Sequence, residues 1–276
     1  MRFSKYQGTG NDFIVLDKRA GGAPLSAEVV MRLCDRHRGI GADGVLTLWK
    51  EPEHDFRMQV QNADGSESEM CGNGLRCVAR FVHDRDTQGG DRLTVRSGDG
   101  TYVIERVAAG VYRVDMGRPT LDSPQLPPES RGRAPFTLMA GEARFDALAL
   151  SFGNPHAVIF TPEDPMQLAV AYGAQLERHP SFPERVNVSF ARSAAPGRFE
   201  AVVFERGSGI TQACGSGACA VAIAAVWSGR TQRDQAIEIA LPGGVLTISV
   251  DAGDRVLLQG PAELVFTGEV DETRLR

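Results

Sequence analysis

The feature that most constrains the fold of this 276-residue chain is an internal repeat. Cys71 and Cys214 lie 143 positions apart, and the same separation carries Gly10-Asn11 onto Gly153-Asn154. It also carries Val15, Phe56, Val60, Gly72, Gly74, Val78 and Ala79 onto Val158, Phe199, Val203, Gly215, Gly217, Val221 and Ala222. A constant separation over so many identities indicates a duplicated structural unit. We therefore predict two similar domains that face each other, with the two cysteines across a shared cleft, a favoured place for ligands.

The spacing of apolar residues predicts the same order of elements in both halves. In the first half a helix is expected from Ser26 to about His37, and another directly after Cys71. In the second half a helix is expected from Pro165, capped by Asp164, and another from Cys214 to Gly229. Alternation predicts strands at 3–7, 13–17, 45–49, 56–62, 93–95, 102–106, 111–115, 147–151, 157–160, 187–190, 199–205, 237–241, 246–250 and 256–259.

A stretch rich in proline separates the two halves. It holds Pro119, Pro124, Pro127, Pro128 and Pro135, and proline at this density disfavours regular structure. We predict an N-terminal domain over 1–118, a linker over 119–140 and a C-terminal domain over 141–261, with 262–276 as a candidate to rejoin the first domain.

Composition excludes several classes of function. The net charge is -5, which gives no electrostatic footprint for nucleic acid. No apolar run approaches the 18 or more residues that span a bilayer, and the first residues lack the apolar segment of a signal peptide. We expect a cytoplasmic protein that acts on a small molecule, not on nucleic acid or a membrane.

Two of the five cysteines stand in matching glycine-rich motifs, Cys71-Gly72-Asn73-Gly74 and Cys214-Gly215-Ser216-Gly217. Each motif is expected where a loop enters a helix, and a helix N-terminus offers free N–H groups and partial positive charge. These groups bind a carboxylate and should lower the pKa of the thiol. The sequence therefore predicts two reactive thiols beside a carboxylate site.

The other cysteines, Cys34, Cys77 and Cys219, are expected to be buried packing residues. A disulfide framework is not expected, because the number of cysteines is odd and no secretion signal is present. The spacing of Cys71 to Cys77 and of Cys214 to Cys219 does not fit a zinc knuckle, so no metal site is predicted. The segment Gly39–Gly44 matches G-x-G-x-x-G but leads from a helix into a strand, the reverse of the dinucleotide-binding context.

The motifs taken together resemble those of the diaminopimelate epimerase family, in order and over residues 3 to about 244. The matching segments are Phe3-Ser4-Lys5, Gly8–Phe13, Arg36–Gly41, Asn62–Glu67, Cys71–Gly74, Gly153–His156, Arg185–Asn187, Glu205–Gly207 and Thr211–Ala218. The resemblance implies an α/β (α+β) fold of two pseudo-symmetric domains, each a mostly antiparallel sheet wrapped around a central helix, with the active site in the interdomain cleft. It also implies interconversion of LL- and meso-2,6-diaminopimelate in lysine and peptidoglycan synthesis, by a homodimer that needs neither pyridoxal phosphate nor metal.

The resemblance also implies roles for individual residues. The catalytic cysteines of the family fall on Cys71 and Cys214, and two residues that tune them fall on His156 and Glu205. The substrate-binding positions fall on Asn11, Asn62, Gly72, Asn73, Asn154, Asn187, Glu205, Arg206, Gly215 and Ser216. One position departs from the pattern: Gly44 stands where some members carry a glutamine that touches substrate.

Inversion at an α-carbon needs a base on one face and an acid on the other, and a thiolate and a thiol can fill these roles. Arg206 is the candidate for the distal carboxylate, because a guanidinium binds a carboxylate bidentately. Two alternatives remain open at this point. One is a cysteine-pair racemase for another amino acid, of the proline type. The other is a dithiol redox protein, although no Cys-x-x-Cys motif is present.

Overall fold

The computed structural model describes residues 1–68, 70–86 and 90–271. The chain divides into two compact units. Among the described residues, unit 1 comprises Met1–Val114 and residues 259–271, and unit 2 comprises Asp115–Leu258. The sequence marks residues 262–276 as a candidate to rejoin the first domain. Residues 262–271 are grouped with unit 1, and residues 272–276 lie outside the described residues. Residues 119–140, expected as a linker, are grouped with unit 2.

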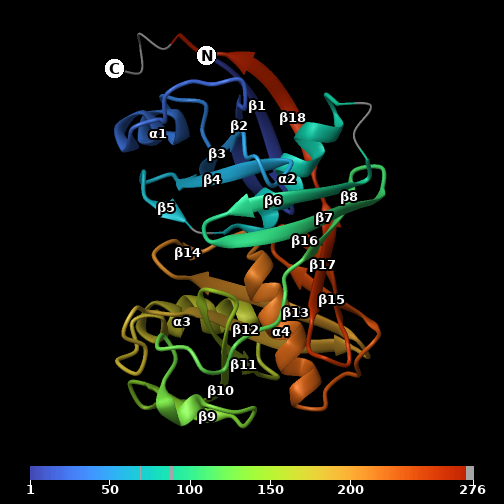
Figure 1. Cartoon of the computed structure of the whole chain (residues 1–276). Coiled ribbons are helices and arrows are strands. Elements are labelled where there is room, and N and C mark those ends of the chain that lie inside the picture. The colour runs from blue at the N-terminus through green and yellow to red at the C-terminus, as the bar shows by residue number, and fades with distance from the viewer. Residues whose placement is uncertain (69, 87–89, 272–276) are drawn as a thin grey trace. The chain divides into compact units, whose positions relative to one another are not determined.

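Unit 1 is a mixed, mostly antiparallel sheet with two helices (Figure 1). Its strands pair in the order β18-β1-β2-β3-β4-β6-β7-β8, and the β2–β3 and β4–β6 pairs are parallel. The short β5 pairs with β4. The elements are β1 Arg2–Gly8, β2 Asn11–Lys18, α1 Ala27–Cys34, β3 Gly44–Trp49, β4 Phe56–Asn62, β5 Glu67–Ser68, α2 Gly72–His83, β6 Arg92–Ser97, β7 Gly100–Ala108, β8 Val111–Asp115 and β18 Glu263–Glu269.

Unit 2 repeats this topology. Its strands pair in the order β9-β10-β11-β12-β13-β15-β16, with β11–β12 and β13–β15 parallel and the short β14 against β13. The elements are η1 Pro128–Ser130, β9 Phe136–Ala140, β10 Ala143–Ser151, β11 Pro155–Phe160, α3 Pro165–Glu177, β12 Asn187–Ala195, β13 Arg198–Glu205, β14 Gly209–Ile210, α4 Gly215–Trp227, β15 Ala236–Leu241 and β16 Gly244–Val250. Strand β17, Val256–Pro261, begins in unit 2 and ends in unit 1. The predicted duplication and the mostly antiparallel α+β fold are confirmed.

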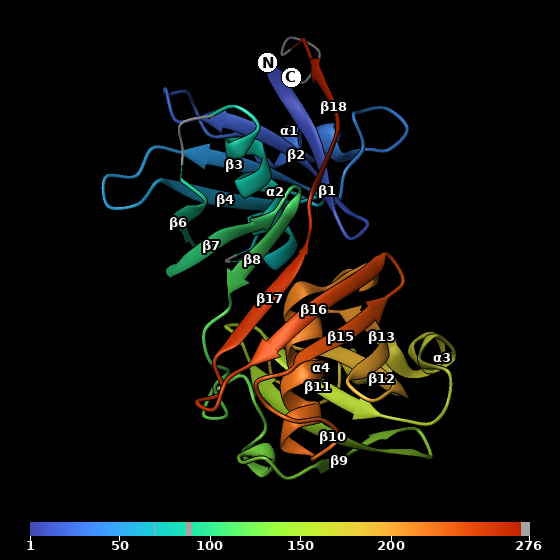
Figure 2. The ribbon, with the colours of Figure 1, turned by 90° about the vertical axis from the view of Figure 1, so that its right-hand side faces the viewer.

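One helix in each unit is enclosed by strands (Figure 2). Helix α2 packs against β1, β2, β3, β4, β7 and β18, and helix α4 packs against β10, β11, β12, β13, β15 and β16. Every residue of α4 from Gly215 to Val226 is buried. Its sequence is small and apolar on all faces, as a fully enclosed helix requires. The sheets therefore wrap around α2 and α4, and the first turn of each helix carries a predicted motif.

The second helix of each unit lies against a neighbouring part of the sheet. Helix α1 begins after Ser26, whose side chain accepts from the amide of Val29, and α3 begins after Asp164 with Pro165 in its first turn. Helix α1 ends at Cys34, three residues before the predicted end. Asp35 leaves the helical conformation with a ψ of 119°, and its carboxylate accepts from the amides of His37 and Arg38 at 2.8 Å.

Candidate functional site

The first half-site is built on the N-terminus of α2. Cys71 is the N-cap residue, and its Sγ accepts a hydrogen bond from the amide of Gly74 at 3.3 Å. A side chain at Gly74 would come within 3.1 Å of Leu46 and 3.3 Å of the Cys71 Cβ, so the close turn favours glycine here. The thiol thus occupies the place that serine or aspartate takes in an ordinary N-cap, with the open amides of the first turn around it.

Two asparagines complete the first half-site. Asn11, the first residue of β2, accepts at its Oδ1 from Asn73 Nδ2 at 3.1 Å, and Cys71 Sγ lies 3.9 Å from the same oxygen. Of the predicted site residues in unit 1, the structure brings together Asn11, Cys71, Gly72 and Asn73. Asn62 ends β4, and its amide nitrogen donates to Ser66 Oγ at 3.0 Å within the following turn. No contact places Asn62 with Cys71 among the described residues.

Gly44 opens β3 opposite Asn62. A Cβ at this position would lie 2.6 Å from the carbonyl oxygen of Gln61. A side chain at position 44 would therefore require the β3 and β4 backbones to move apart. Glycine at position 44, where some members of the family carry a glutamine, therefore permits the close approach of β3 and β4.

The second half-site is built in the same way on α4. Cys214 is the N-cap residue, and its Sγ accepts from the amide of Gly217 at 3.4 Å and lies 3.6 Å from Ser216 Oγ. Asn154, the counterpart of Asn11, donates from Nδ2 to Ser216 Oγ at 3.4 Å. Cys214 is buried, whereas Cys71 is partly exposed. The repeat therefore yields two thiols in equivalent positions but in different solvent environments.

The environment of Cys214 raises the pKa of its thiol well above the ordinary value. The main cause is burial, and the next is the carboxylate of Glu205; hydrogen bonds from Ser216 and from the amide of Gly217 act in the opposite direction. The prediction that the helix N-terminus would lower this pKa is wrong for Cys214. The amide of the first turn does favour the thiolate, but desolvation and a neighbouring negative charge outweigh it.

His156 and Glu205 reach Cys214 by different routes. Glu205 acts on the thiol directly, and its Oε1 accepts a hydrogen bond from the Thr211 hydroxyl. His156 is fully buried, and its Nε2 lies 3.1 Å from Asn154 Oδ1, so its link to the thiol runs through Asn154 and Ser216. Burial, followed by the positive charge of Arg206, lowers the pKa of His156 to about 3. The imidazole is therefore neutral and acts through its hydrogen bond.

Asn187 and Arg206 lie together at the ends of neighbouring strands. Asn187 is buried; its Nδ2 donates to the carbonyl of Pro155 at 2.9 Å and its Oδ1 accepts from the Arg206 amide at 3.0 Å. Both ends of its amide are thus engaged with backbone. The Arg206 guanidinium donates to the Glu184 carbonyl at 3.3 Å and lies 4.0 Å from the Glu184 carboxylate. Asn187 therefore positions residue 206.

Two residues that contact this machinery were not singled out from the sequence. Thr211 lies in the recognised segment before Cys214 and holds Glu205. Asp43 lies in the Gly39–Gly44 segment that was set aside as a nucleotide motif, and it accepts a hydrogen bond from Asn11. Asp43 is 32 residues from Asn11, and Thr211 is six residues from Glu205, on the far side of the turn after β13; neither spacing predicts the contact.

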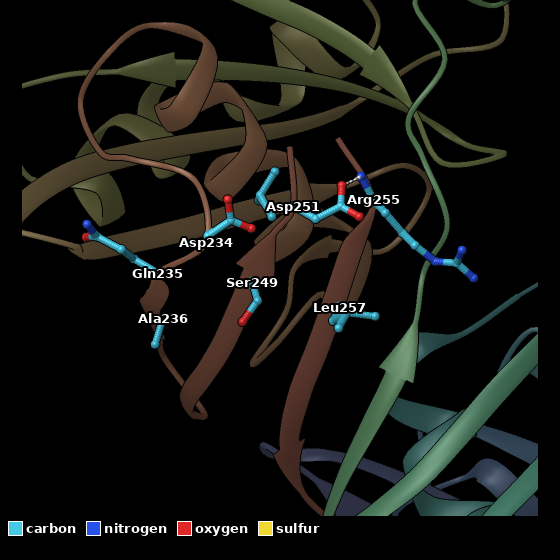
Figure 3. Close-up of a pocket in the computed structure, with 8 residues that line it drawn as sticks. Asp234, Gln235, Ala236, Ser249, Asp251, Arg255 and Leu257 are labelled. Carbon is cyan, nitrogen blue, oxygen red and sulfur yellow. Dashed lines mark hydrogen bonds between the residues drawn. The ribbon is translucent and has the colours of Figure 1, made fainter. Parts of the chain in front are cut away.

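Within the described residues, no group of three or more histidine, cysteine, aspartate and glutamate side chains is arranged to hold a metal ion. None of the described helices is both long and apolar enough to span a bilayer. A hollow of about 310 Å³ in unit 2 is lined by Asp234, Gln235, Ala236, Ser249, Val250, Asp251, Arg255 and Leu257 (Figure 3). It contains none of the predicted site residues, and its Arg255 guanidinium is already paired with Asp115.

A family model described as diaminopimelate epimerase matches residues 3–121 and 148–265. A diaminopimelate epimerase of Carboxydothermus hydrogenoformans is 40% identical over 275 residues, which is 98% of this chain and 99% of the relative. One of Desulforudis audaxviator is 44% identical over 279 residues, again 98% and 99%.

Solved structures share the fold at low sequence identity. A predicted epimerase of Pseudomonas aeruginosa has a TM-score of 0.68 at 16% identity, over 98% of both chains. A probable proline racemase of Agrobacterium radiobacter has a TM-score of 0.70 at 14% identity, over 98% of this chain and 92% of that one.

Proposed function

The chain belongs to the diaminopimelate epimerase family, and we propose that it interconverts LL- and meso-2,6-diaminopimelate by proton transfer between an α-carbon and the thiols of Cys71 and Cys214. The observation that carries the proposal is the duplicated N-cap. Each thiol starts an enclosed helix and accepts from the amide three residues on. The 38–44% identity to relatives named diaminopimelate epimerase supports the substrate.

In the proposed reaction one cysteine, as thiolate, takes the α-proton from one face of the carbon. The other cysteine, as thiol, gives its proton to the opposite face. One C–H bond breaks and one forms, so no hydrogen is gained or lost, and the two cysteines leave with exchanged protonation states. Proton transfer by a positioned group contributes about 10²–10⁴ in rate.

The starting protonation state of Cys214 follows from its surroundings. Burial and the Glu205 carboxylate favour the neutral thiol of Cys214, which suits it to act as the acid in one direction of the reaction. In the reverse direction the roles exchange. Charge that develops on the substrate carboxylate would be met by the open amides of the first helical turns. Each such preorganised donor is worth about 10²–10³ in rate.

Diaminopimelate carries a second amino-acid group at the end distal to the reacting α-carbon. We assign the binding of this group to polar side chains outside the two helix turns. Arg206 offers a guanidinium that can bind a carboxylate bidentately, and the backbone of residue 206 is held by Asn187. Asn62, at the end of β4, is the candidate contact from unit 1. Proline carries no distal amino acid, so these groups favour diaminopimelate over a proline-type substrate.

We further propose that the enzyme is a cytoplasmic homodimer that uses no pyridoxal phosphate, in the pathway to lysine and peptidoglycan. Family membership supports each part. Pyridoxal phosphate is held as a Schiff base on a lysine, and the lysines of this chain are Lys5, Lys18 and Lys50. Lys5 is buried against Asp12, Lys18 is partly buried and Lys50 is exposed. Leu264, Val265 and Phe266 of β18 expose apolar surface that a second copy could cover.

The test is incubation with meso-diaminopimelate in deuterated water, followed by separation of stereoisomers and measurement of α-deuterium. The unaltered enzyme should form the LL isomer with deuterium at the inverted carbon. Cys71→Ala and Cys214→Ala should each lower the rate of inversion by at least about 10²-fold, because each removes an acid or a base.

Cys77→Ala and Cys219→Ala are the matched controls. Both side chains are buried inside α2 and α4, and neither occupies the N-cap position of its helix, where Cys71 and Cys214 lie. Both variants should retain inversion. Activity in Cys71→Ala, or exchange on proline but not on diaminopimelate, would contradict the proposal.

A further inference from the structure

The amide of Asn11 has a defined orientation because of Asp43. Asn11 Nδ2 lies 2.7 Å from Asp43 Oδ2. A carboxylate can only accept, so the end of the amide that faces it must be the nitrogen. The oxygen of Asn11 is thereby turned toward Asn73 Nδ2 at 3.1 Å and Cys71 Sγ at 3.9 Å.

Asp43 is itself held in place from two sides. Its Oδ1 accepts from the Arg36 guanidinium at 2.7 Å, and its Oδ2 also accepts from the amide of Asp12 at 3.2 Å. Arg36 donates at the same time to both carboxylate oxygens of Asp12, at 2.7 and 3.2 Å. Arg36 therefore joins the two carboxylates, and the position of Asp43 relative to β2 is fixed.

The equivalent asparagine in unit 2 has the opposite orientation. Asn154 turns its oxygen to His156 Nε2 at 3.1 Å and its nitrogen to Ser216 Oγ at 3.4 Å. The counterpart of Asp43 in the repeat is Val186, which has no polar side chain. The two half-sites thus differ in which end of the asparagine faces the cysteine loop, and the presence of Asp43 accounts for the difference.

We propose that Asp43, held by Arg36, is a positioning residue for Cys71. It acts through Asn11, which it orients so that a hydrogen-bond acceptor, and not a donor, faces the sulfur. An acceptor favours the S–H form of Cys71, and a donor would favour the thiolate. The role of Asp43 in catalysis rests on the proposed function. Its effect on the Cys71 thiol can be tested without any substrate.

Other charged groups surround the same half-site. They are Lys5 of β1, Asp12 of β2, Arg36 between α1 and β3, and Arg76 of α2. The variant Asp43→Asn leaves all of them in the chain and replaces the carboxylate that faces Asn11, Arg36 and the amide of Asp12. The new amide can present its own oxygen or nitrogen, so it no longer dictates the orientation of Asn11.

The experiment measures alkylation by iodoacetamide at each cysteine separately, by peptide mass spectrometry over a range of pH. In Asp43→Asn the pH midpoint for Cys71 should fall by about one unit, roughly a tenfold gain in thiolate near neutral pH. The midpoint for Cys214, in the other unit, should not move. Asp43→Ala, which removes the carboxylate altogether, should shift Cys71 in the same direction, and it serves as the second variant if Asp43→Asn does not fold.

Two controls separate positioning from general loosening. Asp17→Asn breaks a comparable ion pair on β2, with Arg19, away from Asn11, and it should leave both midpoints unchanged. In an Asn11→Leu background, which removes both ends of the amide, Asp43→Asn should have no further effect on Cys71. An unshifted Cys71 midpoint, equal shifts of Cys71 and Cys214, or a shift that persists without Asn11 would overturn the proposal. Failure to epimerise diaminopimelate would leave these outcomes intact and would count against the proposed function alone.

Discussion

Cys71 and Cys214 occupy the same position of equivalent helices, yet their surroundings differ. Cys214 is buried beside the carboxylate of Glu205, and Cys71 is partly exposed beside the amide oxygen of Asn11. Burial and a carboxylate favour the S–H form of Cys214, whereas at Cys71 a hydrogen-bond acceptor favours it. The duplicated motif supplies the two sulfurs, and residues outside the motif make them unequal.

The burial of His156 predicts a pH effect on stability. Its pKa is about 3 in the folded chain, against 6.5 for an ordinary histidine, so between these values the unfolded chain binds a proton that the folded chain does not. Stability that is present above pH 6.5 is therefore lost as the pH falls. The free energy of unfolding should decline by about 1.4 kcal/mol per pH unit below 6.5, relative to His156→Gln.

Urea unfolding at pH 7.0, 6.0 and 5.0 would measure this difference in slope. The comparison concerns slopes, so a constant penalty for burying glutamine does not affect it. If the free energy of unfolding changed equally with pH in the two proteins, His156 would take up its proton in the folded chain and would not be a buried neutral group.

At the residue scale, the sequence predicted which side chains gather at each helix start but not their protonation. Cys71, Asn11 and Asn73 were placed by motif, as were Cys214, Asn154, Ser216 and Glu205. The raised pKa of Cys214 could not be anticipated, because it depends on how deeply α4 is enclosed and on the nearness of a strand end. The same holds for the hydrogen bonds of the Asn187 amide to the backbone of Pro155 and Arg206, while its contact with substrate stays a prediction.

At the scale of elements, helix α3 and strand β13 meet at a glycine. A Cβ at Gly173 would lie 2.3 Å from Cδ2 and 2.7 Å from Cγ of the Phe204 ring. Replacing glycine by alanine inside a helix usually stabilises it by about 1 kcal/mol. Gly173→Ala should instead destabilise the chain by about 1–3 kcal/mol, because the overlap forces the ring and the helix apart.

The measurement is the free energy of unfolding in urea for a double-mutant cycle with Phe204→Ala. With the ring removed, the added methyl group has room, so Gly173→Ala should cost less in that background or be neutral. An equal cost in both backgrounds would show that the close contact with Phe204 is not its origin.

The sequence does not predict strands β9 and β18 or the first half of β10, and the pattern of their side chains explains why. Strand β18 and the first half of β10 carry mostly exposed side chains, so the alternation of apolar and polar residues that marks a half-buried strand is weak there. Strand β9 does alternate, but it lies within residues 119–140, for which the density of proline predicts a linker. These segments are strands because their backbones pair with β1 and β10, and their own side chains do not predict that pairing.

At the scale of the whole molecule, unit 1 is assembled from both ends of the described chain. Strand β1 lies between β2 and β18, and Phe3 meets Phe266 edge to face at 5.9 Å. Removal of the chain after Ala262 should therefore expose one edge of β1 and one side of α2. We expect faster hydrogen exchange in β1 and β2 and unchanged protection in β10 to β13 of unit 2.

Hydrogen exchange followed by mass spectrometry of the full chain and the shortened chain would resolve these peptides. Uniform loss of protection in both units would mean that they do not unfold separately. Unchanged protection in β1 would mean that β18 contributes little to unit 1.

The split of unit 1 has a consequence for how the chain is made. A ribosome releases residues 115–258 as one uninterrupted stretch, so unit 2 can reach its final form while the protein is still being synthesised. Unit 1 is begun first but lacks its last strand until residues 263–269 emerge. Unit 1 is therefore the first unit to be synthesised in part and the last to complete its fold. During that interval the unpaired edge of β1 and the sides of α2 that β18 will cover are open to chaperones, and to the same segment of a neighbouring nascent chain.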